Sequence, residues 1–158
     1  MHGMPLAYLT KIDNNKKFYY IKNKLNFENL LYIGIRSIDK FEEEIIKKHN
    51  IKNINSYNFN NNYDIKKKEI SNFIGDEEVH ISFDVDCIDP SKMDSTGTKC
   101  ENGLKIKNLK KIINFLIKEK KIINIDLTEL NLSLSNKSKQ KESLKTIFYI
   151  FNFLFQSR

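Results

Sequence analysis

Short apolar runs alternate with amphipathic segments along this chain, and this alternation strongly limits the folds open to it. Apolar runs rich in β-branched residues predict strands, and apolar residues at helical spacing predict helices. Strands that alternate with helices predict an α/β fold, with a parallel sheet and helices packed on its faces. The predicted strands are residues 30–35, 53–59, 79–84 and 122–127, and the predicted helices are residues 5–12, 41–50, 64–73, 106–118 and 140–155.

The predicted elements differ in how clear their pattern is. Segment 106–118 is strongly amphipathic, with apolar residues at Ile106, Leu109, Ile112, Ile113 and Leu116. The polar stretch 53–63 is compatible with a loop as well as with a strand. No internal repeat and no linker rich in Pro, Gly or Ser interrupts the sequence, so we expect residues 1–158 to form one domain.

The composition argues against several functional classes. No stretch approaches the roughly 18 apolar residues that a membrane span needs, so we expect no membrane partner. The net charge of +7 comes from lysine mixed with asparagine and isoleucine, with arginine only at Arg36 and Arg158, so we expect no nucleic-acid partner. No basic-then-apolar leader opens the sequence, and two cysteines are too few for a disulfide framework. We therefore expect a cytoplasmic protein with ordinary thiols.

Acidic residues follow three of the predicted strands. Asp84 and Asp86 end the third strand, Asp126 and Glu129 end the fourth, and Asp39 follows the first. The carboxyl ends of parallel strands meet on one rim of an α/β sheet, where ligands bind. Two carboxylates as close as Asp84 and Asp86 repel each other unless a cation lies between them, and their hard oxygens suit magnesium, calcium or manganese. The alternative is that they are turn and cap residues.

Several segments together resemble the ureohydrolases, and within them arginase. The segments are HISFDVDCIDPS at residues 80–91, STGT at 95–98 and Gly103-Leu104, with HGMP at 2–5, LYIGIR at 31–36 and IDLTELN at 125–131. They occur in the family's order over most of the chain. The resemblance implies the later half of an arginase-type fold, an α/β three-layer sandwich with a parallel sheet.

The resemblance also implies an activity and its cofactor. Arginases hydrolyse L-arginine to L-ornithine and urea, using a hydroxide that bridges two manganese ions and attacks the guanidinium carbon. By this resemblance Asp84 and Asp86 are metal ligands. The family forms trimers, so the resemblance implies a homo-oligomer as well.

Four further residues match family positions at the substrate. Glu129 matches the carboxylate that pairs with the guanidinium, Asp39 one near the α-amino group, and Thr98 a polar contact beside the reacting centre. His2 matches the histidine proposed to pass protons to the leaving amine. The alternatives are structural: Glu129 as a residue at a helix start, Asp39 as the N-cap of the 41–50 helix, and His2 as a residue of the chain end.

The matching segments belong to the later half of an arginase only. The earlier half of the family supplies a first histidine ligand and an Asp-x-His-x-Asp segment, and none of His2, His49 and His80 lies in such a pattern. We therefore expect this chain to be incomplete for catalysis. Three hypotheses remain: part of a catalytic arginase, a non-catalytic arginase-like subunit with a structural or regulatory role, and a basic binding module.

Overall fold

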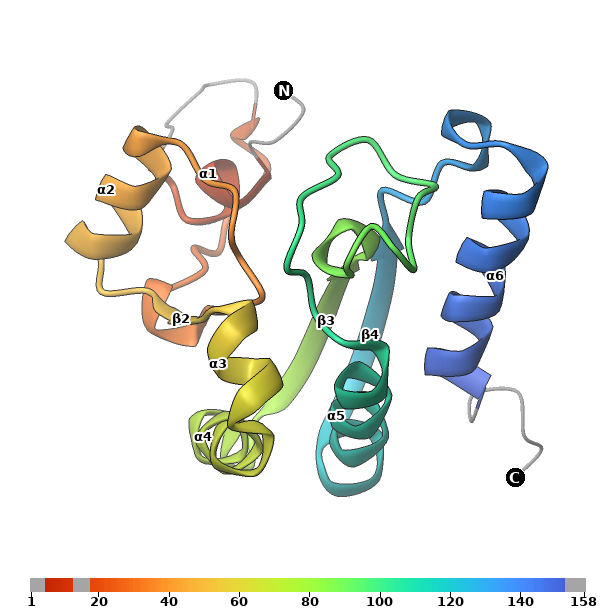
Figure 1. Ribbon diagram of the computed structural model, residues 1–158. Helices are drawn as coiled ribbons and strands as arrows, with labels where there is room; N and C mark the ends of the chain where they lie inside the picture. Colours follow the sequence, from red (N-terminus) through yellow and green to blue (C-terminus); the bar gives the residue numbers. More distant parts are fainter. Residues whose placement is uncertain (1–4, 13–17, 153–158) are drawn as a thin grey trace. The chain divides into compact units, whose positions relative to one another are not determined.

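The computed structural model describes residues 5–12 and 18–152, and the chain divides into two compact units (Figure 1). Unit 1 comprises Met1–Tyr32 and Ile38–Asn53, and unit 2 comprises Ile33–Ser37 and Ile54–Arg158. The assignment of the whole chain to one domain stays a prediction. Among the described residues, no helix has both the length and the apolar character needed to cross a bilayer.

Unit 1 is built from short elements joined by aromatic contacts. Its helices are α1 (Pro5–Leu9) and α2 (Lys40–Lys48), with a 3-10 turn η2 (Phe27–Asn29) between them. The buried Tyr8 of α1 stacks on Phe18 with ring centroids 3.9 Å apart, and Phe27 stacks on His49 at 4.1 Å. The strands β1 (Leu31–Ile33) and β2 (Lys52–Ile54), which continue into unit 2, form a two-stranded sheet.

Unit 2 contains a parallel strand pair with its crossover helix. Strands β3 (Glu78–Asp84) and β4 (Lys121–Thr128) pair from Glu78 opposite Lys121 to Asp84 opposite Thr128. Helix α5 (Ile106–Glu119) connects them and packs against β4 and against α6 (Lys137–Phe151) (Figure 1). The remaining elements are helices α3 (Ser56–Asn61) and α4 (Tyr63–Ile74) and the 3-10 turns η3 (Val85–Cys87) and η4 (Leu132–Leu134). The predicted α/β class with parallel strands is confirmed.

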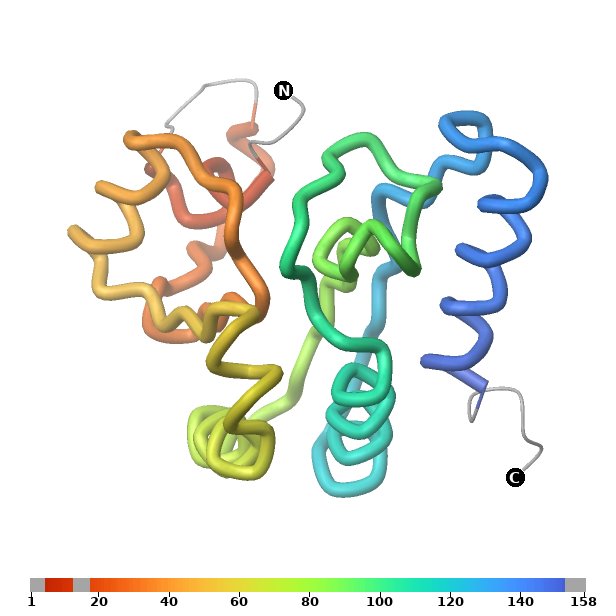
Figure 2. Tube along the Cα trace, viewed as in Figure 1, coloured from red at the N-terminus to blue at the C-terminus, as the bar shows by residue number. Residues whose placement is uncertain are grey.

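Buried apolar side chains hold the elements of unit 2 together. The apolar stripe of α5 buries Leu109, Ile112, Ile113 and Leu116, as the sequence pattern predicted. Each such side chain contributes about 1.5–3 kcal/mol when it is removed from water. The loop after β3 adds buried side chains of its own, Val85, Ile88, Met93 and Leu104. This loop therefore packs as part of the core, and Figure 2 traces it in green over the upper ends of β3 and β4.

Prediction and structure differ most after β2. The strand predicted for residues 53–59 is wrong, because β2 ends at Ile54 and helix α3 begins at Ser56. Asn55 causes the change: its side chain accepts a hydrogen bond from the main-chain N–H of Asn58 at 2.8 Å, which caps the helix. Asn136 caps α6 in the same way, so that helix begins before the predicted residue 140. The predicted residues after 152 lie outside the described part.

Candidate active site

The first two candidate ligands lie where β3 ends. Asp84 is the last residue of β3, and Asp86 lies in the 3-10 turn that follows. One oxygen of Asp84 accepts a hydrogen bond from the main-chain N–H of Asp86 at 3.0 Å. The extended backbone that would carry both side chains on one side of the sheet therefore ends at Asp84. The capped turn brings the two carboxyl groups together instead.

The environment of Asp86 is electrically unfavourable for a carboxylate. Its pKa is raised from 3.8 to about 6, first because of burial, then because of the charge of Asp84 and a hydrogen bond between the two carboxyl groups. The charge of Glu129 raises it further, and the Arg36 guanidinium acts in the opposite direction. The Arg36 guanidinium compensates only part of this negative charge, so the paired carboxylates favour a nearby cation.

Glu129 approaches this cluster from the end of β4. It directly follows Thr128, the residue opposite Asp84 in the strand pair, and its side chain is exposed. Its φ angle is 62°, a left-handed conformation that costs a residue with a side chain about 1–2 kcal/mol. Strained backbone of this kind concentrates at functional sites. The sequence carried no sign of this strain.

Not every acidic residue near the strand ends joins the cluster. Asp126 lies inside β4, and its carboxylate is 3.0 Å from Nε2 of His80 on β3. Asn124 donates to Asp126 at 3.1 Å and lies 3.2 Å from Nδ1 of His80. Both ends of the imidazole are thus engaged on the sheet. Glu129, directly after β4, is instead close enough for its charge to raise the pKa of Asp86.

Thr98 lies in the loop between η3 and α5, and its side chain is exposed. The loop is closed at its base, because Leu104 N–H donates to the Cys87 carbonyl at 2.8 Å. A second set of bonds holds its middle. Ser95 N–H donates to Oγ of Ser143 at 3.2 Å, and the hydroxyls of Ser95 and Ser135 lie 2.6 Å apart. The loop that carries Thr98 is therefore fixed on both sides of it.

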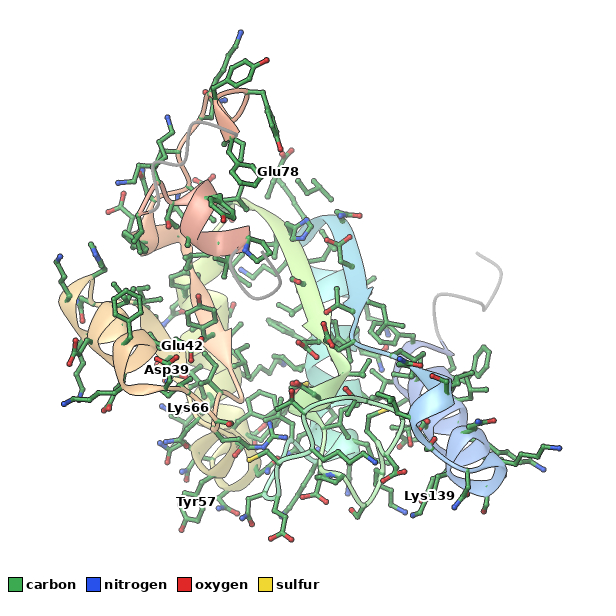
Figure 3. All side chains as sticks on the ribbon, turned by 90° about the horizontal axis from the view of Figure 1, so that it is seen from above. Asp39, Glu42, Tyr57, Lys66, Glu78 and Lys139 are labelled. Atoms are coloured by element: carbon green, nitrogen blue, oxygen red, sulfur yellow. The ribbon has the colours of Figure 1, made fainter. Side chains whose placement is uncertain are left out.

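Asp39 lies in unit 1, where the structure gives it a local role. Its Oδ1 accepts from Glu42 N–H at 2.8 Å, and Oε2 of Glu42 accepts from Asp39 N–H at 2.9 Å. Figure 3 shows the two labelled side chains close together at the start of α2. This is a capping box, so the N-cap alternative for Asp39 is confirmed. Its predicted substrate contact stays a prediction, and His2 lies outside the described residues.

The donor atoms at the end of β3 match some of the requirements of a manganese site. Asp84 and Asp86 offer the hard oxygens that this ion prefers, and their clustered charge favours a cation. Within residues 5–12 and 18–152, however, no group of three or more His, Cys, Asp or Glu side chains is arranged to hold a metal ion. Two carboxylates do not enclose two ions. The described residues therefore do not fit a two-manganese centre by themselves.

Comparison with known protein families and sequences gives one consistent result. A family model described as "Arginase family" matches residues 1–151. The arginase of Emericella nidulans is 31% identical over 141 residues, which cover 85% of this chain and 44% of that protein. The arginase of Plasmodium berghei is 33% identical over 159 residues, which cover 90% of this chain and 43% of that protein. The chain spans less than half the length of these curated relatives.

Solved structures show the same correspondence. Entamoeba histolytica arginase in complex with L-ornithine matches with a TM-score of 0.80 and 28% identity, over 95% of this chain and 52% of that chain. The arginase of Bacillus caldovelox matches with a TM-score of 0.83 and 24% identity, over 99% of this chain and 53% of that chain. The α/β arrangement corresponds to one half of the fold of these proteins.

Proposed function

This chain belongs to the arginase family, and we propose that it supplies part of the active site of a hydrolase that converts L-arginine into L-ornithine and urea. The observation that carries the proposal is the pairing of Asp84 and Asp86 at the end of β3, with Glu129 at the end of β4 close enough for its charge to raise the pKa of Asp86. Three carboxylates follow these two strand ends although the chain as a whole has a net charge of +7. A concentrated negative charge on a basic protein favours a cationic substrate and a metal ion.

Asp84 and Asp86 have the role of manganese ligands in this proposal. Their oxygens suit the ion, and a bound cation would relieve the repulsion that raises the pKa of Asp86. The ligands needed to complete a two-manganese centre would come from residues that this chain does not contain, because it spans less than half of its relatives. When bound, manganese supplies the Lewis acidity that activates water at neutral pH.

The substrate contacts follow from the chemistry of the guanidinium group. Glu129 offers two acceptor oxygens, which match two parallel N–H donors of a guanidinium in a bidentate pair. Its exposed carboxylate is free to meet a ligand. Thr98 contributes a hydroxyl beside the reacting centre, and Asp39 a carboxylate for the α-amino group. His2 is proposed to pass a proton to the leaving amine.

The assembly and location belong to the proposal as well. We expect a homo-oligomer, a trimer by resemblance to the family, and a place in the cytoplasm. The second candidate function is a non-catalytic arginase-like subunit with a structural or regulatory role. It is favoured by the absence of a third metal ligand beside Asp84 and Asp86 in the described part of the chain.

The test is urea release from L-arginine, with manganese, by the purified chain combined with the part of a relative that this chain does not cover, for example that of the Emericella nidulans arginase. The wild type is compared with Asp86→Asn and Glu129→Gln in the same mixture. The matched control is Asp76→Asn, which removes an exposed carboxylate before β3, at the opposite end of that strand. We expect urea from the wild type and from the control, and at least a tenfold loss in the two site variants. If the folded wild-type chain binds that part and manganese and still forms no urea, the hydrolase proposal for this chain is overturned in favour of the non-catalytic subunit.

A further inference from the structure

The guanidinium of Arg36 is surrounded by main-chain carbonyl oxygens. Arg36 follows β1, and its Nη2 donates to the carbonyl of Asp86 at 2.6 Å and to that of Cys100 at 2.8 Å. Its Nε donates to Cys100 at 3.1 Å and to Glu101 at 3.2 Å. Its Nη1 donates to the carbonyls of Cys87 and Gly34, each at 3.3 Å. One side chain thus joins three stretches of main chain.

All three nitrogens of the Arg36 guanidinium donate hydrogen bonds in this arrangement. A guanidinium carries five N–H donors in a planar fork, whereas a lysine ammonium is a point charge with three. The carbonyls of Cys100 and Glu101 lie in a loop, where no strand or helix supplies donors. Buried or half-buried carbonyls need such partners. Arg36 takes part in none of the ion pairs found among the described residues. Its N–H groups donate to main-chain carbonyls instead.

The approach of Arg36 to the loop depends on the residue two positions earlier. Gly34 has a φ of +89°, and a Cβ placed on it would lie 2.8 Å from Cδ1 of Leu104. The absent side chain lets the main chain at Gly34 run close to Leu104 at the base of the loop. Gly34 N–H also donates to the Ile54 carbonyl at 2.7 Å. These contacts place residues 33–37 in unit 2, although both neighbouring segments belong to unit 1.

We propose that Arg36 is a positioning residue for the candidate site. It fixes the turn that carries Asp86 and the far end of the loop that carries Thr98, so that both keep a constant place at the ends of β3 and β4. This inference rests on the proposed function, because it takes Asp86 and Thr98 as site residues. A lysine cannot replace Arg36, since one ammonium cannot reach carbonyls on three segments.

Hydrogen exchange of the purified chain tests the role directly. The main-chain N–H groups of Asp86, Ile88, Gly103 and Leu104 are hydrogen-bonded beside the carbonyls that Arg36 holds. We expect Arg36→Met to raise exchange there roughly tenfold or more, because bonds from a charged donor are lost. Arg36→Lys should recover little of the protection. The control is Lys120→Met, which removes a bond of 2.7 Å to the Gly75 carbonyl and should leave the loop unchanged.

Rescue separates positioning from general stability. In Arg36→Ala, added guanidinium should restore protection of the loop amides, and ammonium at the same concentration should not. Unchanged loop exchange in Arg36→Met would overturn the proposal, as would equal acceleration in the loop and in α5. This readout needs neither L-arginine nor manganese. If the loop is released but the wild type forms no urea, the proposed function fails and the fixing of the loop by Arg36 stands.

Discussion

Replacement of Gly34 by alanine tests two separate consequences of the packing beside the site. Gly34 has a left-handed φ of +89°, and its missing Cβ would lie 2.8 Å from Cδ1 and 2.9 Å from Cγ of Leu104. Leu104 is only 2% exposed, so its side chain has little room to move away. Alanine at this position therefore meets both backbone strain and a steric clash.

The loss of stability expected for Gly34→Ala is the sum of these two costs. Strained φ/ψ values cost about 1–3 kcal/mol for a residue with a side chain. Overpacking of a filled core costs about 1–3 kcal/mol more. We therefore expect Gly34→Ala to lower the free energy of unfolding by about 2–6 kcal/mol. That is a large part of the total stability of a typical domain, which is about 5–15 kcal/mol.

Two other glycines provide matched controls for the two contributions. Gly75 has a φ of +57° and no atom within 4 Å of a Cβ, so Gly75→Ala should show the strain alone, about 1–3 kcal/mol. Gly97 has neither a positive φ nor a close neighbour. Gly97→Ala should stabilise the chain by about 0.4–1 kcal/mol, because alanine has fewer conformations to lose on folding.

Urea denaturation of the wild type and the three variants, followed by circular dichroism, measures these differences. The expected order of stability is Gly97→Ala above the wild type, then Gly75→Ala, then Gly34→Ala. The reasoning is refuted if Gly34→Ala is as stable as Gly75→Ala, because the clash with Leu104 then costs nothing. Equal stability of Gly75→Ala and Gly97→Ala would refute the strain contribution.

Two further predictions concern the carboxylates. The pKa of Asp86 in the folded chain is about 6 against 3.8 for the free group, so the folded state holds the proton more tightly, and stability should fall as pH rises from 3.8 to about 6. Asp86→Asn should flatten this part of the curve in denaturation at a series of pH values, and an unchanged curve would assign the pH dependence to another group. At Glu129, with its φ of 62°, glycine relieves strain that alanine keeps, so Glu129→Gly should be more stable than Glu129→Ala by about 1 kcal/mol. Thermal unfolding measures the difference, and equal midpoints would contradict the strained conformation.

The sequence predicted the strongly periodic parts of the fold well. The apolar stripe of α5 and the β-branched runs of β3 and β4 each depend on burial of one face, which the spacing of residues records directly. The strand predicted for residues 53–59 was wrong because an asparagine side chain there forms a local hydrogen bond with the main chain. Asn55 caps α3 by accepting from Asn58 N–H, and this bond decides between strand and helix where apolar periodicity is weak.

The candidate site was predicted in part for a similar reason. The rule that ligands bind at the carboxyl ends of parallel strands drew attention to Asp84, Asp86 and Glu129. Arg36 was missed because bonds from a side chain to main-chain carbonyls leave no pattern in the residues that accept them. The one available signal was the scarcity of arginine, which occurs at two positions among 27 basic residues. The left-handed backbone of Glu129 left no signal at all.

The path of the chain between its two units limits how the protein can be shortened. The chain leaves unit 1 after Tyr32, returns to it at Ile38 and leaves it again after Asn53. No single cut therefore separates the units intact. A gene beginning at Ile54 would encode Asp84, Asp86, Thr98 and Glu129 but would leave out Arg36, and the carbonyls of Asp86, Cys100 and Glu101 would lose their guanidinium partner. A shortened version that keeps these carbonyls bonded must carry residues 33–37 as well, joined to the rest through a redesigned connection.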